Sequence, residues 1–170
     1  MHQRRRRLAL TAAALLATVP AGCGFALRQA PVLAFESIYV GASSASPMGS
    51  EIRRSVATLN HVQLITDASR QQEAQVILEL LAEQREKVVA GLNSAGQVRE
   101  FQLRIRVRFR LRTPGGKELI PDTELLQQRE ISFNESAVLA KEAEEGLLYR
   151  DMQSDIVQQL IRRLAAVRTL

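Results

Sequence analysis

A strictly alternating segment near the middle of the chain constrains the fold more than any other feature. Apolar side chains occupy every odd position from Phe101 to Leu111, and arginines occupy every even position from Arg104 to Arg112. Successive side chains of a β-strand point to opposite faces, so this spacing predicts a strand with one apolar and one cationic face. The apolar face has to be covered by a second layer of the protein.

The segments around this strand supply the rest of a sheet and the helices that could cover it. Residues 91–96 (GLNSAG) and 114–116 (PGG) have the composition of turns on either side of the strand. Apolar residues recur at helical spacing in two other segments. We expect strands at residues 35–40, 76–89, 101–112 and 119–133, a short strand or an extended connection at 62–66, and helices at 51–60, capped by Ser50, and at 136–166.

The order of these elements predicts an α+β fold. Two helices would pack on one face of a mostly antiparallel sheet of about four strands, forming an elongated two-layer sandwich. A strand of fifteen residues reaches about 50 Å and a helix of thirty-one about 46 Å, so the two layers match in length. An apolar stripe that recurs every four residues from Leu148 to Leu164 would face the sheet. Residues 35–170 are expected to form one domain of this kind.

The N-terminal residues are typical of a bacterial lipoprotein signal. Four arginines at residues 4–7 precede an apolar run at residues 8–19, and Ala21 and Gly22 stand directly before Cys23, the only cysteine. The apolar run is too short for a bilayer core, which needs roughly 20 residues. We expect residues 1–22 to be removed, Cys23 to carry an S-diacylglycerol and an N-acyl chain, and residues 23–34 to form a lipid-anchored tether. A free buried cysteine and an uncleaved anchor are the alternatives, and Pro20 departs from the usual residue of such signals.

Removal of the signal changes what the charge of the chain implies. The full chain has 23 basic and 18 acidic residues and a pI near 10.1. Residues 1–22 contain four arginines and no acid, which leaves 19 basic against 18 acidic residues and a formal charge of +1. The high pI is therefore largely a property of the signal, and it gives no support for a nucleic-acid-binding protein.

Few residues of the mature chain suit catalysis. His61 is its only histidine, and Cys23 is committed to lipid, so neither a His/Cys zinc site nor a Cys–His nucleophile is available. A hydrolase that uses only carboxylates is the one enzymatic alternative. We expect no enzyme, no metal and no cofactor apart from the covalent lipid.

Four short motifs give the chain a resemblance to a known family. They are GCGFALR at residues 22–28, GQVREF at 96–101, LAKE at 139–142 and QLIRRL at 159–164. With these motifs in this order, the chain resembles the LptE family of LPS-assembly lipoproteins of Gram-negative outer membranes.

The resemblance implies a role as well as a fold. LptE proteins plug the lumen of the LptD β-barrel, support its folding, bind lipopolysaccharide and help to insert it into the outer leaflet. Gly24, in place of the aspartate that retains lipoproteins at the inner membrane, is consistent with an outer-membrane location. The alternative is a generic periplasmic lipoprotein adaptor of another envelope complex that binds no glycolipid.

The arginine face of the alternating strand is one candidate binding surface. Guanidinium groups present paired donors that suit the phosphates and carboxylates of lipopolysaccharide, which makes Arg104, Arg106 and Arg108 candidate contacts. The alternative is a solvated face balanced by acids on neighbouring strands, with Glu79 and Glu83 on one face of theirs and Glu124 and Glu130 on one face of theirs. Arg85 and Lys87 are expected to be solvated.

The resemblance adds two further candidates for lipopolysaccharide binding. Lys141 matches a basic position of the LAKE motif that the family links to this binding. The family also implies a basic residue in the hairpin loop, but here the loop reads Asn93-Ser94-Ala95 and has none. Arg99 is the nearest candidate, and the alternative for Lys141 is an ordinary exposed lysine.

Overall fold

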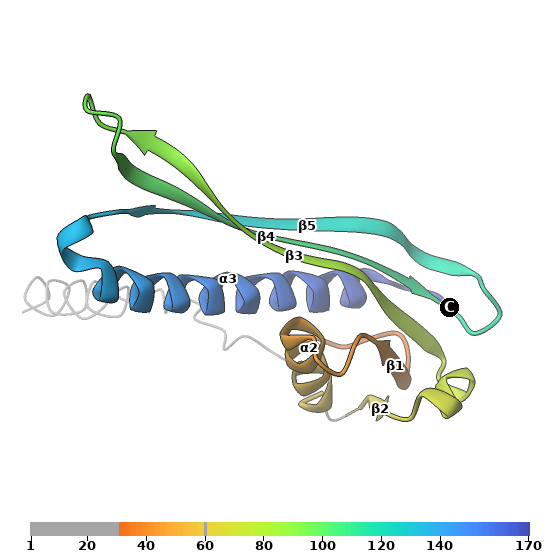
Figure 1. Ribbon diagram of the computed structural model, residues 1–170. Coiled ribbons are helices and arrows are strands. Elements are labelled where there is room, and N and C mark those ends of the chain that lie inside the picture. Colours follow the sequence, from red (N-terminus) through yellow and green to blue (C-terminus); the bar gives the residue numbers. More distant parts are fainter. Residues whose placement is uncertain (1–30, 60) are drawn as a thin grey trace, which may run out of the picture.

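A computed structural model describes residues 31–59 and 61–170. Three long strands and one long helix make up most of this part of the chain (Figure 1). The strands are β1 (Ser37–Gly41), β2 (Gln63–Ile65), β3 (Val76–Leu92), β4 (Val98–Arg112) and β5 (Glu118–Ser132), and the α-helices are α2 (Pro47–Ala57) and α3 (Val138–Ala166). Two short 3-10 helices, η1 (Ala68–Glu73) and η2 (Glu135–Ala137), precede β3 and α3.

The strands form one open sheet in the order β2-β1-β3-β4-β5. β3, β4 and β5 are antiparallel to one another, whereas β1 is parallel to both β2 and β3. The sheet thus has one strand more than the four or so expected, and it is mixed instead of mostly antiparallel throughout. The parallel pairs arise because α2 and η1 lie in crossover connections, which return the chain in the same direction.

Both helices lie on the same side of the sheet (Figure 1), so the expected α+β architecture is confirmed. The odd-numbered residues of β4 from Leu103 to Leu111 are fully buried beneath them, as the alternation predicts. The stripe of α3 packs against this face, and α2 contributes a second set of buried side chains. The helix residues of the core are Met48, Ile52 and Val56 of α2 and Met152, Ile156, Val157, Leu160, Ile161 and Leu164 of α3.

Helix α2 begins four residues earlier than expected. Ser46, not Ser50, is its N-cap, because the Ser46 hydroxyl accepts a hydrogen bond from the backbone N–H of Gly49 at 2.8 Å. Pro47 occupies the first turn, where its missing N–H and fixed φ suit a helix start. The serine-rich composition of residues 41–50 concealed this start by indicating a loop.

A β-bulge between Leu80 and Ala82 divides β3 into two parts. Because the extra residue reverses the alternation of side chains, Glu79 faces away from the helices while Glu83 lies on their side and accepts a hydrogen bond from Ser46. The expectation that Glu79 and Glu83 share a face is therefore wrong. The same reversal directs Arg85 and Lys87 towards α3, where they bond to Gln153 and Glu145 while remaining exposed to solvent, as expected.

The body is elongated, and its two ends differ. Figure 1 shows β1, β2 and α2 gathered at one end of the long sheet, while at the other end the β3–β4 hairpin rises away from α3. Leu33, in the segment expected to form the tether, is buried at the first end, and its N–H donates to Nε2 of His61 at 3.1 Å. The chain therefore enters the folded body at the end opposite the hairpin.

Candidate functional site

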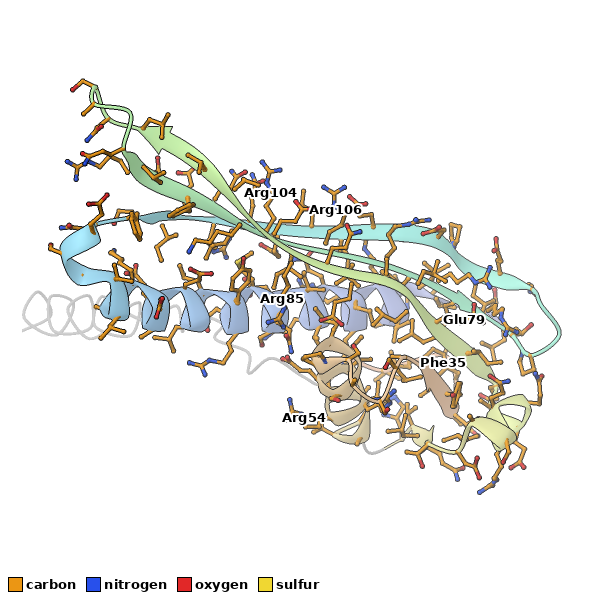
Figure 2. All side chains as sticks on the ribbon, in the orientation of Figure 1. Phe35, Arg54, Glu79, Arg85, Arg104 and Arg106 are labelled. Atoms are coloured by element: carbon orange, nitrogen blue, oxygen red, sulfur yellow. The ribbon has the colours of Figure 1, made fainter. Side chains whose placement is uncertain are left out.

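The candidate residues lie on two surfaces that the sheet separates. The five arginines at even positions of β4, from Arg104 to Arg112, project from the face opposite the helices, and Figure 2 shows Arg104 and Arg106 on this outer side while Arg85 points towards α3. Arg99 and Lys141 lie instead at the hairpin end, where β4 begins and α3 starts. Arg99 occupies an odd position of β4 and the outer arginines occupy even ones, so the alternation already separates Arg99 from them. The sequence gives no sign that Lys141 lies near Arg99.

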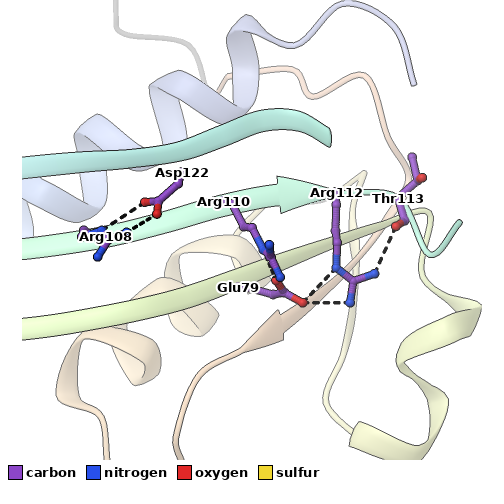
Figure 3. A network of polar contacts seen from close by, with 6 residues as sticks. All are labelled: Glu79, Arg108, Arg110, Arg112, Thr113 and Asp122. Atoms are coloured by element: carbon purple, nitrogen blue, oxygen red, sulfur yellow. Dashed lines mark hydrogen bonds and ion pairs between the residues drawn. The ribbon is translucent and has the colours of Figure 1, made fainter. Parts of the chain in front are cut away.

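Part of the arginine face is neutralised by acids of the two neighbouring strands (Figure 3). Glu79 of β3 pairs with Arg110 and with Arg112, whose Nη2 lies 2.8 Å from Glu79 Oε1. Asp122 of β5 pairs with Arg108. Partial burial raises the pKa of the Glu79 carboxyl, but the hydrogen bonds from Arg112 and Arg110 outweigh it, and the pKa lies below its usual range. Acids of neighbouring strands therefore balance Arg108, Arg110 and Arg112, in agreement with the alternative hypothesis of a charge-balanced face.

The two remaining arginines of this face, Arg104 and Arg106, have weaker or no pairing with acids. The ion pair between Arg106 and Glu124, at 3.9 Å, is the longest on the arginine face. The Nε atom of Arg106 is buried without a hydrogen-bond partner among the described residues. Arg104 bonds only to the amide oxygen of Gln102, with Nε at 2.7 Å, and has no ion pair within the described chain. The surface therefore changes from acid-paired arginines at Arg112 to available ones at Arg104.

Lys141 lies on the helix side, against a pair of aromatic rings. The rings of Phe101 and Phe133 meet edge to face with centroids 5.3 Å apart, and they line a small hollow with Lys141 and Val138. The ammonium of Lys141 donates to Ser132 Oγ and to Glu144 Oε2, each at 2.9 Å. Lys141 is therefore half-buried, unlike an ordinary exposed lysine, and it lines the hollow beside the two rings.

Arg99 lies on the other side of Phe133. It lines a hollow of about 310 Å³ between the start of β4 and the turn from β5 into α3. The turn is ordered by Asn134, whose Oδ1 accepts from the N–H of Ser136 at 3.0 Å. Arg99 is exposed and forms no ion pair within residues 31–59 and 61–170. The two hollows meet at Phe133 and are lined by three bases, Lys87, Lys141 and Arg99, and by three acids, Glu135, Glu142 and Glu145.

Phe101 and Phe133 are site residues that sequence reasoning did not single out. Their odd positions on the two strands assign them to the apolar face, which gives no reason to separate them from the core. They become part of a site because α3 begins at Val138 and does not cover this end of the sheet completely. That incomplete cover depends on the relative lengths of elements distant in sequence.

Two further findings concern the chemistry available to the described chain. No group of three or more histidine, cysteine, aspartate or glutamate side chains within residues 31–59 and 61–170 is arranged to hold a metal ion. None of the helices in these residues combines the length and the apolar character that crossing a membrane requires. Cys23 and residues 1–22 lie outside the described residues.

Comparisons with known proteins agree with this architecture. A sequence model of the LptE family, described as lipopolysaccharide-assembly, matches residues 35–164. The chain is 27% identical to the LPS-assembly lipoprotein LptE of Pectobacterium atrosepticum, over 96% of this chain and 88% of that protein. It is 30% identical to LptE of Yersinia pestis, over 96% of this chain and 78% of the relative.

Solved structures show the same fold. The solution structure of a lipoprotein B from Nitrosomonas europaea superposes with a TM-score of 0.72 at 36% identity, over 84% of this chain and 91% of that one. The crystal structure of the rare lipoprotein B from Shewanella oneidensis gives a TM-score of 0.62 at 21% identity, over 76% and 94%. The family model spans nearly all of the folded body, and the chain therefore belongs to the LptE family of lipopolysaccharide-assembly lipoproteins.

Proposed function

We propose that this chain is an outer-membrane lipoprotein that plugs the LptD β-barrel, supports its folding and assists the assembly of lipopolysaccharide into the outer leaflet. The match of the LptE family model to residues 35–164 is the observation that carries the proposal. The narrow, elongated shape of the body is compatible with a barrel lumen (Figure 1). In this role the protein catalyses no reaction.

Anchoring through lipid on Cys23 follows from the signal-like N-terminus. After removal of residues 1–22, nine residues lie between Cys23 and the buried Leu33, and a fully extended chain over these ten steps reaches at most about 35 Å. Because Leu33 lies at the end that carries β1 and β2, the anchor would hold this end near the membrane. The hairpin end, with Arg99 and Lys141, would then point away from the anchor.

Lipopolysaccharide binding is assigned to two sets of bases. Lys141 and Arg99 would hold phosphate groups at the hairpin end, where Phe133 lies between them. Arg104, Arg106 and Arg108 of the outer face would make further contacts, with Arg104 the least engaged by other protein groups. A charge-assisted hydrogen bond to phosphate is stronger than one between neutral groups.

The proposed partner is tested by purifying the full chain from detergent-solubilised outer membranes. Co-purification of an LptD-sized barrel, together with an acylated mass for the peptide that begins at Cys23, is expected. A freely isolated protein with an unmodified thiol, whose loss leaves surface lipopolysaccharide unchanged, would favour the generic adaptor instead.

The proposed ligand is tested by Lys141→Glu. We expect lipopolysaccharide to bind several-fold more weakly while the barrel complex still forms, because the change reverses one charge beside the Phe101–Phe133 pair. Lys117→Glu is the matched control, since Lys117 is an exposed lysine in the turn between β4 and β5, at the other end of the sheet. A binding isotherm identical to that of the wild type would remove Lys141 from the site.

A further inference from the structure

Most bases of the described chain are held by a neighbouring group, but three at the C-terminal end of α3 are not. Arg162, Arg163 and Arg168 are exposed, and none of them forms a hydrogen bond or an ion pair within the part of the chain that the structure describes. Arg162 and Arg163 belong to the last turns of the helix, and Arg168 lies just beyond its end. We call these three residues the terminal arginine cluster.

Few acids oppose the terminal arginine cluster. From Met152 to the C-terminus, Asp155 is the only acidic side chain, and it accepts a hydrogen bond from Arg129 of β5 at 3.1 Å. Lys117 donates to the backbone oxygen of Leu170, the last residue, at 3.0 Å, so a base already stands beside the terminal carboxylate. The C-terminal dipole of α3 attracts cations, but it leaves their guanidinium N–H groups free to bind an anion.

Acids of the neighbouring elements have other partners nearby. Glu118, at the start of β5, lies opposite Arg112 in the β4–β5 register. In η1, Glu73 pairs with Arg70 at 2.7 Å, and Asp67 accepts a hydrogen bond from the first turn of that segment. No described acid of these elements forms an ion pair with the terminal arginine cluster.

The terminal arginine cluster lies at the end of the body where the chain enters it. The hydrogen bond from Lys117 places Leu170 beside the turn between β4 and β5, which is the end opposite the β3–β4 hairpin (Figure 1). Leu33 is buried at this same end, and Cys23 lies at most about 35 Å along the chain from it. The proposed lipid anchor therefore brings a membrane surface to the end that carries the cluster.

The hairpin end has no such surplus of free bases. Beside Arg99 it carries three acids, Glu100, Glu135 and Glu142, and none of these forms an ion pair within the described residues. Anionic lipids attract bases close to a membrane surface and repel acids. A negatively charged surface would therefore attract the anchor end more strongly than the hairpin end.

The positions of the three arginines suit a flat surface that meets the end of the helix. Successive residues of an α-helix point about 100° apart, so Arg162 and Arg163 splay around the helix axis. A surface along one side of α3 would contact only one of them, whereas a surface across its end contacts both, together with Arg168. Guanidinium groups present paired donors that suit the phosphates of lipid headgroups.

We infer that the terminal arginine cluster rests on the anionic phospholipid headgroups of the leaflet that holds the lipid anchor. The inference rests on the proposed function, since the acyl chains on Cys23 bring the membrane to this end. The anchor sets where the body is held, and the cluster sets which way it faces: α3 meets the membrane with its C-terminal end, and the hairpin points away.

The test measures how close the C-terminus lies to the headgroups. The lipidated chain, produced without a partner, is reconstituted in vesicles of phosphatidylcholine alone or of phosphatidylcholine with one third phosphatidylglycerol. Cys23 is the only cysteine, and its thiol is acylated in the proposed protein, so Thr169→Cys introduces a single reactive thiol for a fluorescent donor. The acceptor is a phospholipid labelled on its headgroup.

We expect energy transfer from residue 169 to be about twofold higher in the vesicles that contain phosphatidylglycerol, because the cluster is attracted to that surface. The transfer should fall to the phosphatidylcholine level in the triple variant Arg162→Gln, Arg163→Gln and Arg168→Gln. Salt at about 0.5 M should lower it in the same way, because salt screens the attraction. A donor at Ser94→Cys, in the turn of the β3–β4 hairpin, should show low transfer in both kinds of vesicle.

The matched control removes the same number of charges from other surfaces. Arg54→Gln, Arg70→Gln and Arg150→Gln change residues of α2, η1 and the middle of α3, and together they should leave the transfer from residue 169 unchanged. Both triple variants should melt as the wild type does, because they replace exposed side chains.

Several outcomes would overturn the inference. Equal transfer in the two kinds of vesicle, or an equal loss for the two triple variants, would show that the terminal arginine cluster makes no specific contact with phospholipid. Loss of the co-purified barrel in the cluster variant, with unchanged energy transfer, would assign the cluster to a protein partner. Low transfer in a chain whose Cys23 is acylated overturns this inference alone. Labelling of the Cys23 thiol itself would show that the anchor is absent, and the proposed function would fail as well.

Discussion

The two ends of this molecule belong to the same sheet but differ in how completely helices cover it. At the end with β1, β2 and α2, helices cover the sheet and core residues such as Ile38, Ile52 and Phe109 are fully buried. At the hairpin end, α3 starts short of the strand ends, and Val89, Leu92 and Leu139 remain exposed. Apolar side chains at the first end therefore stabilise the fold, whereas those at the second are exposed to solvent and contribute little to it.

The strongest test of this difference between the two ends is to truncate one apolar side chain at each end. Phe109→Ala should lower the free energy of unfolding by about 3–5 kcal/mol, because it leaves a cavity in the core. Leu139→Ala should change it by less than about 0.5 kcal/mol, because the side chain is already in water. Urea unfolding followed by circular dichroism measures both. Similar losses for the two variants would contradict the division.

A smaller effect is expected from the ion pairs of the outer face, and it depends on pH. Because the pKa of Glu79 is lowered in the folded protein from its ordinary value of 4.5, its stabilisation is present above that pH and is lost as the pH falls through the folded pKa. Glu79→Gln should cost about 1 kcal/mol at pH 7, and the difference from the wild type should shrink below pH 4.5.

The measurement is the free energy of unfolding of both proteins between pH 7 and pH 3. Glu130→Gln is the control, since Glu130 lies on the same outer face but no ion pair joins it to a described residue. A gap between wild type and Glu79→Gln that stays constant down to pH 3 would show that Glu79 does not titrate as its arginine partners require.

The smallest expected effect separates the two parts of the arginine row. Arg104→Gln with Arg106→Gln should weaken lipopolysaccharide binding a few-fold without changing the stability, because neither guanidinium has a close acid partner. Arg110→Gln with Arg112→Gln should lower the stability slightly and leave binding unchanged, because both side chains already hold Glu79. The reverse pattern in paired titration and melting experiments would assign the ligand to the acid-paired part.

Local sequence patterns predicted the helices and strands of this fold better than they predicted which strands pair with one another. The alternation of β4 identified its buried and outer faces correctly, because side-chain direction in a strand depends only on position along that strand. The parallel pairing of β1 and the helix start at Pro47 were missed, since the first depends on a crossover and the second on a cap within a serine-rich segment.

The candidate site shows the same limit more clearly. The five arginines at even positions of β4, from Arg104 to Arg112, are equivalent in the sequence, yet Glu79 and Asp122 divide them in the structure. Their partners come from two other strands, whose register the sequence of β4 does not contain. Lys141 and Arg99 were selected one by one through the family resemblance, and only the packing of Phe133 between their hollows relates them.

The surplus residue at Leu81 decides on which side of β3 its charges lie. With uninterrupted alternation, Arg85 would lie opposite Arg104 and Lys87 opposite Gln102, and both bases would join Arg104 and Arg106 on the outer face. Gln84 and Glu86 would be forced beneath α3 in their place. One extra residue in β3 thus separates two groups of bases. Arg85 and Lys87 contact α3, and the arginines of β4 from Arg104 to Arg112 project from the opposite face.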